Sequence, residues 1–449
     1  MFKKTLLLAA LAALASDCTV DAKKEKARGA KGGGRGGGGK KPKPEPVDPD
    51  PVPDPVDPDP VPDQVLDPND VSKFSDFADK MASDGGNYVW KSYKAFSGAS
   101  GQEYELNMFR IVGDANGDTI SAPNGPILLT HGFASDSITW FGGTAGELAF
   151  GTKLADAGYD VWYANLRGTR YSRQNQAWNA DSNASSYWNY DLNDYAEEDV
   201  PAMVKKIIEV AGDCKKVSIV GHSLGAQAQI NMLSKTTQAT KYVAQSLNLA
   251  PCIVADANSF LPGVDAALYN TVESSFGSLG YYSLFGPNWG TQTFWLCFFS
   301  GYGAECDLLQ SIETYNASTG TGFQEVCLQV LLHLTQIYLA DRFQEFDSNI
   351  NDSTLSPEIL FTDLKVPSRF MWMDNDTLCP EAKQKTFLPS INAVDEDNFA
   401  RDHYYPAGAN DATFMASVFN LLSNSGEDIA SGDCTPITGM TAAGNIFFP

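Results

Sequence analysis

The stretch "KKVSIVGHSLGAQAQI", residues 215–230, sets a single serine between a short apolar run and a helix-like segment. Residues 217–220 have the apolar character of a buried strand, and the residues after Leu224 have that of a helix. Between them, residues 221–225 read Gly-His-Ser-Leu-Gly and match the pattern G-x-S-x-G. In a strand–turn–helix context this pattern predicts a nucleophile elbow, with Ser223 in a strained conformation at the carboxyl end of a sheet. A tight turn with an idle serine is the alternative interpretation.

Strand-like and helix-like segments alternate on both sides of this stretch. The strand-like segments are residues 104–111, 126–131, 159–165, 216–221, 243–251 and 367–374. The helix-like segments are residues 147–158, 192–212 and 411–424. This alternation predicts an α/β fold with a mainly parallel sheet flanked by helices. The pattern is interrupted between about residues 252 and 362, which we interpret as a helical cap or lid insertion in a catalytic domain spanning 67–449.

The N-terminal part is expected to lie outside the fold. Residues 1–16 combine a positive start, a short apolar run and an Ala-Leu-Ala cleavage site, which is typical of a secretory signal peptide. A lipoprotein signal ending at Cys18 fits less well, because an aspartate precedes that cysteine. Residues 17–66 are predicted to be a disordered linker, first basic and Gly-rich, then Pro/Asp-rich with the unit "PVDPDPVPD" repeated.

Composition narrows the classes of function. The chain has 449 residues, 43% of them apolar, and a formal charge of −23. This charge argues against nucleic acid or an anionic membrane as a direct partner. Beyond the signal peptide, no apolar run is long enough to be a transmembrane segment. The eight cysteines fit an oxidising compartment, and Cys297 and Cys306 could pair, although connectivity cannot be deduced from sequence. N-glycosylation acceptors occur at Asn183, Asn316, Asn351 and Asn375.

A serine nucleophile needs a histidine base, and the chain has four histidines. His222 lies within the elbow and should point away from the serine hydroxyl. His333 lies in an apolar helical run and is expected to be structural, and His131 ends an earlier strand. In a fold with this elbow the triad follows the chain order Ser, Asp or Glu, His. His403 is therefore predicted to be the base.

Three aspartates compete for the role of the acid that orients His403. Asp374 and Asp376 lie in the loop after residues 367–373, and Asp402 adjoins the histidine in sequence. Sequence neighbours rarely face each other, so we favour Asp376, with Asp374 second. Any one of the three carboxylates could instead be solvated.

An oxyanion hole requires backbone amides that face the developing charge. The residue after the nucleophile, Leu224, is expected to supply one donor. "HGF" at residues 131–133 fits the loop that supplies the other, with Phe133 as the donor. No metal-spaced cluster and no phosphate-cradling glycine loop is present in the sequence, so we expect no metal or cofactor.

Over residues 69–425 the sequence resembles the acid lipase family, the gastric and lysosomal lipases and their relatives. The motifs that carry the resemblance are "LTHGFASDSITW", "LADAGYDVWYANLRGTRYSR", "YWNYDLNDYAEEDVPAMV", "VPSRFMWMDNDTLCP" and "RDHYY". The resemblance implies an α/β-hydrolase fold, a triad of Ser223, Asp376 and His403, and an oxyanion hole of Phe133 and Leu224.

The sequence departs from this family at a few site-proximal positions. Leu224 replaces the usual glutamine, Met373 and Asp374 replace two glycines, and Thr169 replaces an asparagine. Because the oxyanion contribution at Leu224 is a backbone amide, these differences bear on substrate preference more than on the chemistry.

Together these features predict a secreted or luminal serine carboxylic ester hydrolase. The location is extracellular or the lumen of a lysosome-like compartment. The specific prediction is a lipase that cleaves acylglycerols or sterol esters at a lipid interface through an acyl-enzyme. Residues 276–302 hold ten aromatics, which favours a lid over the site, although the same residues could form the core of a cap. The alternatives are a broad-specificity carboxylesterase, a phospholipase, or a non-enzymatic lipid- or wall-binding protein with an idle hydrolase fold.

Overall fold

The computed structural model describes most of the predicted catalytic domain. The described residues are 68–142, 146–212, 215–256, 282–284, 324–347, 356–361, 364–388 and 393–423. The predicted signal peptide and linker lie outside these ranges, as do Cys297 and Cys306. Most of the predicted insertion also lies outside them, including the aromatic stretch 276–302 apart from residues 282–284.

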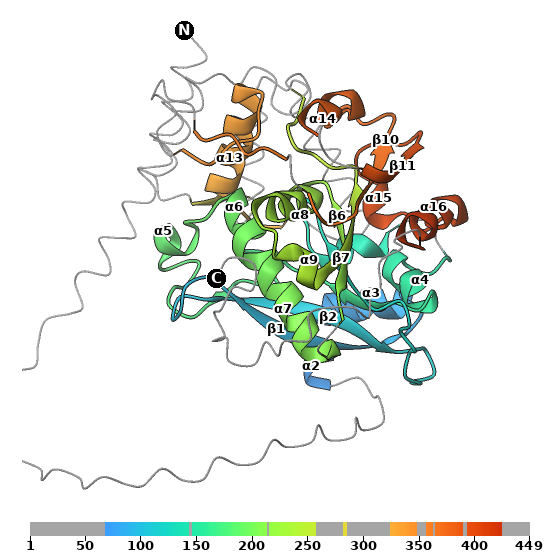
Figure 1. Cartoon of the computed structure of the whole chain (residues 1–449). Helices are drawn as coiled ribbons and strands as arrows, with labels where there is room; N and C mark the ends of the chain where they lie inside the picture. Colours follow the sequence, from blue (N-terminus) through green and yellow to red (C-terminus); the bar gives the residue numbers. More distant parts are fainter. Residues whose placement is uncertain are drawn as a thin grey trace, which may run out of the picture. The chain divides into compact units, whose positions relative to one another are not determined.

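The described core is built on a nine-stranded sheet in the order β1-β2-β4-β3-β6-β7-β10-β11, with β5 paired to β2. The strands are β1 (Val89–Ser97), β2 (Tyr104–Gly113), β3 (Pro126–Thr130), β4 (Asp160–Tyr163), β5 (Gln174–Asn175), β6 (Val217–His222), β7 (Val243–Leu249), β10 (Ser368–Met373) and β11 (Ala393–Phe399). From β4 to β11 every neighbouring pair is parallel, while β1, β2 and β5 are antiparallel to their neighbours. The expected mainly parallel sheet flanked by helices is confirmed (Figure 1).

The six strand-like segments expected from sequence correspond to β2, β3, β4, β6, β7 and β10, and their bounds agree within a few residues. The edge strands β1 and β11 were not expected. β11 reads "AVDEDNF", and its acidic centre hides the strand signal. β1 reads "VWKSYKAFS" and is only half-buried along its centre. Edge strands bury less surface than central ones, so their sequences carry weaker apolar patterns.

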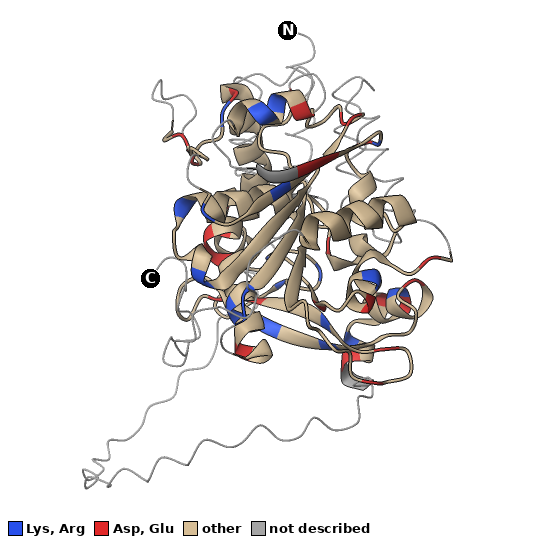
Figure 2. Cartoon of the chain, turned by 45° about the vertical axis from the view of Figure 1, so that its right-hand side comes forward, with Lys and Arg blue, Asp and Glu red and all other residues tan. Residues whose placement is uncertain are grey.

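Each central strand contributes apolar side chains to two cores, one on each face of the sheet. In β3, Leu128 belongs to one core, and Ile127 and Leu129 belong to the other. This alternation follows the two-residue period of a strand, and burial on both faces explains the continuous apolar runs in the sequence. β3, β6 and β7 carry no Lys, Arg, Asp or Glu, and Figure 2 shows charged residues away from these strands.

Helices cover both faces of the sheet. α7 (Val200–Ala211), α8 (Leu224–Lys235) and α13 (Leu328–Ala340) pack into the core that contains Leu128. α3 (Ser75–Ser83), α4 (Phe150–Asp156) and α16 (Ala412–Ser423) pack into the core on the other face. The remaining helices are short: α2 (Pro68–Lys73), η1 (Ser137–Phe141), α5 (Ala184–Tyr187), α9 (Ala239–Tyr242), α14 (Glu381–Phe387) and α15 (Tyr405–Gly408).

The helical run before the elbow is less regular than its sequence pattern predicts. We expected one helix over residues 192–212. The structure has α6 (Leu192–Asp194), then a π-helical turn, η2 (Tyr195–Asp199), and then α7. Pro201 lies at the start of α7. Because proline has no N–H to donate to the preceding turn, the hydrogen-bond ladder is broken there, and a widened turn accommodates the break.

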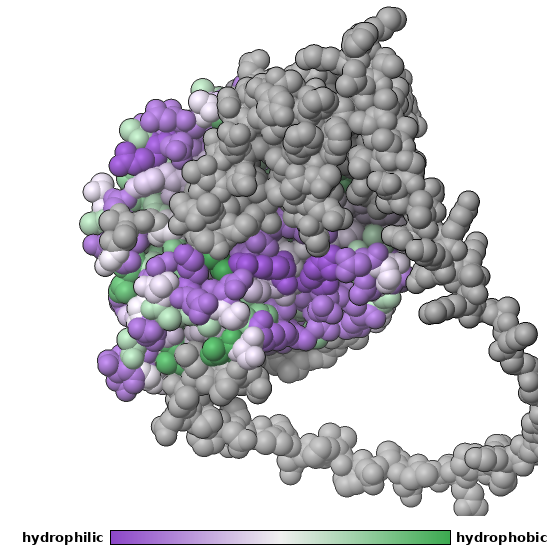
Figure 3. All heavy atoms as spheres, turned by 180° about the vertical axis from the view of Figure 1, so that it is seen from behind, coloured by the Kyte–Doolittle hydropathy of each residue, from purple (hydrophilic) through white to green (hydrophobic). Residues whose placement is uncertain are grey.

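The described part of the predicted insertion contains α13 and a short antiparallel ribbon of β8 (Ser283–Leu284) and β9 (Val326–Cys327). The described surface is largely hydrophilic in the view of Figure 3, and Leu360 is a large apolar side chain that is exposed. Among the described helices, none combines the length and apolar character needed to cross a bilayer.

Candidate active site

Ser223 occupies the sharp turn between β6 and α8. Its backbone has φ 54° and ψ −114°, in the region that L-residues rarely adopt. A Cβ on Gly221 would lie 2.5 Å from the Ala226 nitrogen, and a Cβ on Gly225 would lie 2.5 Å from the Thr130 carbonyl oxygen. Both positions therefore require glycine, as the G-x-S-x-G pattern predicts. Such backbone strain costs about 1–3 kcal/mol, which the packed strand and helix on either side must offset.

The turn brings Ser223 against His403 from the C-terminal part of the chain. The Ser223 Oγ lies 2.8 Å from His403 Nε2, and His403 Nδ1 lies 2.6 Å from Asp376 Oδ2. With Nδ1–H donating to the carboxylate, Nε2 is free to accept the serine proton. The structure thus joins the predicted nucleophile, base and favoured acid in one hydrogen-bonded chain, and all three side chains are buried.

The two competing aspartates lie elsewhere. Asp374 is exposed and accepts a hydrogen bond from the Asn398 side chain at 3.0 Å. Asp402 is exposed and accepts from the backbone N–H groups of Tyr404 and Tyr405, at 3.1 Å each. Both carboxylates therefore serve local loop structure, and neither is hydrogen-bonded to His403.

The environment of Asp376 keeps its carboxylate ionised. Burial opposes ionisation, but it is outweighed by attraction to His403 in its protonated form and by hydrogen bonds from His403 and the Cys379 backbone N–H, so the pKa of Asp376 lies below its ordinary value. The Cys379 N–H donates to Asp376 Oδ1 at 2.7 Å. Each carboxylate oxygen therefore has its own donor, and the carboxylate is held facing the His403 ring.

His222 connects the elbow to the histidine loop. As expected, it does not bond Ser223 Oγ; its Nε2–H donates to the His403 backbone carbonyl at 2.8 Å. Burial lowers the pKa of His222 to about 3, so the ring is neutral. A Cβ on Gly132 would lie only 3.1 Å from His222 Nδ1, which explains a glycine in that loop. This supporting role could not be read from the sequence, because it depends on a contact across 181 residues.

The expected oxyanion residues line one pocket. Phe133, after β3, and Leu224, the first residue of α8, both contribute to it, together with Gly132, Thr169 and Val326. Leu224 lies at the helix N-terminus, where unpaired backbone amides and the helix dipole favour a negative charge. Thr169, one of the departures from the acid lipase pattern, lines the same pocket.

His131 shapes the loop that carries Phe133. The Leu166 N–H donates to His131 Nε2 at 3.2 Å, so the ring proton lies on Nδ1, which donates to the Gly132 carbonyl at 2.9 Å. Burial lowers the pKa of His131, and the neutral ring forms both bonds. His333 also has a structural environment, as expected, because it is buried and bonds the Gln344 carbonyl at 2.7 Å.

A buried ion pair anchors the neighbouring loop. The Arg167 backbone N–H and Nε donate to the two Asp199 carboxylate oxygens at 2.9 and 2.8 Å. The guanidinium also bonds the Ser97 hydroxyl and the Glu198 carboxylate. Asp199 ends the π-helical turn, so this network links that turn to the loop that supports His131.

A disulfide joins Cys252 to Cys379, 127 residues apart. The sequence did not predict this pair. Each cysteine follows a strand, β7 for Cys252 and β10 for Cys379, and these two strands are parallel neighbours. Their carboxyl ends therefore meet at one edge of the sheet. The pair could not be predicted from the sequence, because the sequence does not show which strands are neighbours in the sheet. Cys327, in contrast, is a buried free thiol.

One group of described side chains has the spacing of metal ligands. The ligand atoms of Asp376, Cys379 and His403 all lie within 4.8 Å of one another. The Cys379 sulfur is in the disulfide and offers no thiolate, and the facing atoms of Asp376 and His403 bond each other. This donor set fits a hydrogen-bonded acid–base pair rather than a metal centre.

Comparison with known proteins agrees with this architecture. A family described as having the alpha/beta hydrolase fold matches residues 125–256, which include the elbow. Lipase member N of Mus musculus is 24% identical over 356 residues, covering 71% of this chain and 85% of the relative. The chain therefore has the α/β-hydrolase fold and is similar in sequence to acid lipases.

Two further relatives match this acid-lipase-like hydrolase over shorter segments. Gastric triacylglycerol lipase of Rattus norvegicus is 32% identical over 149 residues, covering 33% of this chain and 36% of the relative. Lysosomal acid lipase/cholesteryl ester hydrolase of Macaca fascicularis is 29% identical over 153 residues, covering 34% of this chain and 37% of the relative. The acid-lipase-like chain is an enzyme of the ester hydrolase type.

Proposed function

We propose that the protein hydrolyses carboxylic esters through a triad of Ser223, His403 and Asp376. The observation that carries this proposal is the continuous hydrogen-bonded chain from Ser223 Oγ through both ring nitrogens of His403 to Asp376, at 2.8 and 2.6 Å. In the first half-reaction, Ser223 Oγ attacks the ester carbonyl while His403 Nε2 accepts the serine proton. The backbone amides of Phe133 and Leu224 stabilise the oxyanion that forms.

The same histidine serves both halves of the cycle. His403 gives the proton to the departing alcohol, which leaves the acyl group on Ser223. It then takes a proton from water as the water oxygen attacks the acyl-enzyme, and it returns that proton to Ser223 Oγ when the acid leaves. Asp376 holds the ring in the required tautomer and stabilises the imidazolium by its charge.

The proposed substrates are lipid esters, specifically acylglycerols or sterol esters. This proposal is supported by the names of the relatives, a triacylglycerol lipase and an acid lipase/cholesteryl ester hydrolase. The distinction from a broad-specificity esterase or phospholipase depends on the aromatic stretch 276–302, most of which lies outside the described residues.

We further propose that the enzyme is secreted or delivered to an acidic organelle, with residues 1–16 as signal peptide and 17–66 as linker. The Cys252–Cys379 disulfide supports a route through an oxidising compartment. N-terminal sequencing of mature protein from an expressing eukaryotic culture tests this, because a retained Met1 in the folded enzyme contradicts it.

The test of the triad is covalent labelling with a fluorophosphonate followed by kinetics of Ser223→Ala. The wild type should be labelled at Ser223, and the variant should lose ester hydrolysis by about 10⁴-fold or more, because triad members act as a unit. Wild-type turnover in a variant with an unchanged circular dichroism spectrum contradicts the assignment.

The lipase assignment has a separate test. The rate on one short-chain ester is followed through its solubility limit. A lid of aromatic side chains that opens at a lipid surface predicts a sharp rise beyond that limit, and Trp289→Ser and Trp295→Ser should reduce the rise. A smooth saturation curve in all proteins identifies an esterase instead.

A further inference from the structure

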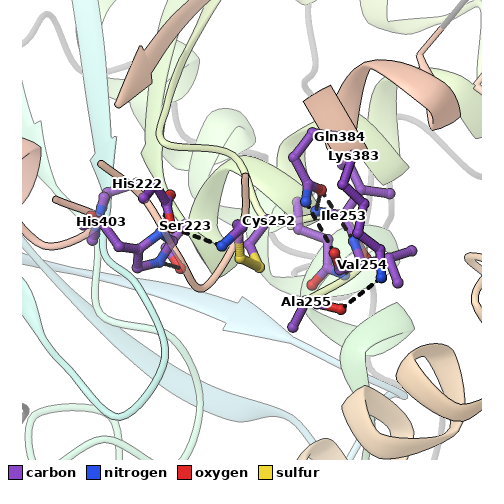
Figure 4. Close-up of a disulfide and its surroundings, with 12 residues drawn as sticks. His222, Ser223, Cys252, Ile253, Val254, Ala255, Lys383, Gln384 and His403 are labelled. Carbon is purple, nitrogen blue, oxygen red and sulfur yellow. Dashed lines mark hydrogen bonds and ion pairs between the residues drawn. A yellow bond between two sulfur atoms is a disulfide. The ribbon is translucent and has the colours of Figure 1, made fainter. Parts of the chain in front are cut away.

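The Cys252–Cys379 disulfide lies against the catalytic side chains. The Cys379 sulfur is within 4.8 Å of the facing ligand atoms of both Asp376 and His403. In the close-up view, Cys252 lies between the Ser223–His403 pair and Gln384 (Figure 4). Both cysteines follow strands whose carboxyl ends lie at the same edge of the sheet as Ser223.

The Cys379 residue also contacts Asp376 directly. Its backbone N–H donates to Asp376 Oδ1 at 2.7 Å, while Asp376 Oδ2 bonds His403. This amide fixes the rotation of the carboxylate about its Cβ–Cγ bond and thereby the direction of Oδ2. Because the amide and the disulfide sulfur belong to the same residue, a tether on that sulfur also restrains the amide.

The rest of the acid loop is largely exposed and is attached to its neighbours on two sides. Residues 374, 375 and 377 are exposed, whereas Cys379 is buried. On one side, the loop is bonded to the chain that leads to His403, through Asp374 N–H to the Phe399 carbonyl and Asn375 N–H to the Arg401 carbonyl, at 2.8 and 3.0 Å. On the other side, the loop is joined to residues 252–256 by the disulfide and by the Asp256 N–H, which donates to the Leu378 carbonyl at 2.7 Å.

The disulfide attaches the loop to a segment that is held by several hydrogen bonds. Residues 252–256 follow β7 and are held by the Gln384 side chain, which accepts from the Ile253 and Val254 N–H groups and donates to the Val254 carbonyl. The Gln227 side chain, on the elbow helix α8, donates to the Ile253 carbonyl at 3.0 Å. Cys252 is therefore fixed to the helix that begins directly after Ser223.

We propose that the Cys252–Cys379 disulfide is a positioning element for the catalytic acid, which holds the Cys379 amide on Asp376 and so aligns the carboxylate with His403. This inference rests on the proposed triad. The disulfide joins the acid loop to the elbow helix through residues 252–256, so that the acid, base and nucleophile keep their mutual distances.

The test measures kcat and KM on a soluble ester for Cys252→Ala/Cys379→Ala, with concentrations of folded protein matched by circular dichroism. We expect kcat to fall about tenfold, equivalent to about 1.4 kcal/mol of activation free energy, with KM within about twofold. If the alanine pair does not fold, Cys252→Ser, which keeps Cys379 and breaks the same tether, replaces it. Lys383→Ala is the matched control, since it removes the 3.1 Å bond from Lys383 to the Ala255 carbonyl but leaves the disulfide, and its kcat should be unchanged.

A double-mutant cycle with Asp376→Asn separates positioning from general stabilisation. If the disulfide acts through Asp376, its removal in the Asp376→Asn background should have no further effect on the residual kcat. The same tenfold loss in both backgrounds overturns the proposal, as does wild-type kcat in the folded alanine pair. A wild-type kcat in Asp376→Asn alone instead overturns the proposed triad, so the two failures are distinguishable.

Discussion

The contact between the elbow helix and the oxyanion loop can be tested with a single methyl group. In Gly225→Ala, the new Cβ would lie 2.5 Å from the Thr130 carbonyl oxygen and 2.6 Å from that of His131. Ordinary van der Waals contact begins at 3.4 Å, so the methyl group is about 0.9 Å too close to the Thr130 oxygen. Both neighbours are backbone atoms, which cannot rotate away as a side chain can. The start of α8 or the end of β3 must therefore move.

This movement should affect stability and catalysis together. Inserting a methyl group into a packed site costs about 1–3 kcal/mol. Thr130 and His131 lead directly into Phe133, so displacing them also displaces one of the two proposed oxyanion donors relative to Ser223. A misplacement of about 1 Å at a reacting centre lowers the rate by about 10²-fold. We therefore expect Gly225→Ala to lower the melting temperature and to lower kcat on a soluble ester by about two orders of magnitude.

Ala228→Gly is the control for a destabilised α8. It lies one turn further along the same helix and adds no atom, and glycine costs about 1 kcal/mol relative to alanine in a helix interior. Its melting temperature should fall while kcat of the folded enzyme stays within about twofold of wild type. If Gly225→Ala behaves like this control, with a stability loss but normal kcat, the reasoning that connects the helix position to the oxyanion loop is wrong.

Three further outcomes follow from the described contacts. Asp376→Asn should lower kcat by about 10⁴-fold by favouring the wrong histidine tautomer, whereas Asp374→Asn and Asp402→Asn should stay near wild type; a larger loss in either of these two contradicts the assigned acid. Because the pKa of Asp376 is lowered in the folded protein, its ionised form adds stability above the unfolded pKa, and that contribution disappears as the pH falls through the folded pKa. Urea titrations should therefore show that the difference in unfolding free energy between the wild type and Asp376→Asn becomes smaller at acidic pH. A difference that does not change with pH would be inconsistent with this. Arg167→Met should cost about 3–5 kcal/mol of unfolding free energy, because it leaves the Asp199 carboxylate buried without its ion-pair partner; a loss below about 1 kcal/mol would mean that the pair contributes little.

Features that depend on contacts within a few residues of the chain were predictable from sequence. The elbow is one example, because a strand period, two glycines and a serine within five residues leave few backbone conformations open. The choice among the histidines also followed from sequence, since His403 alone fits the chain order of the triad. Edge strands β1 and β11 were missed because β1 is only half-buried along its centre and β11 has an acidic centre, so neither has a regular apolar pattern. The π-helical turn before α7 was missed because the apolar period of a helix does not reveal a locally widened turn.

By itself, the sequence determined the α/β class, the position of Ser223, and His403 as its partner, because each depends on order along the chain or on contacts within a few residues. Only the tertiary structure decided which carboxylate meets that histidine, since Asp374 and Asp376 lie two residues apart in one loop and differ only in the direction of their side chains. It also decided the Cys252–Cys379 bond, which joins the ends of two strands that become neighbours only in the folded sheet. Pairing across 127 residues is determined by sheet order and packing, and no local pattern in the chain encodes it.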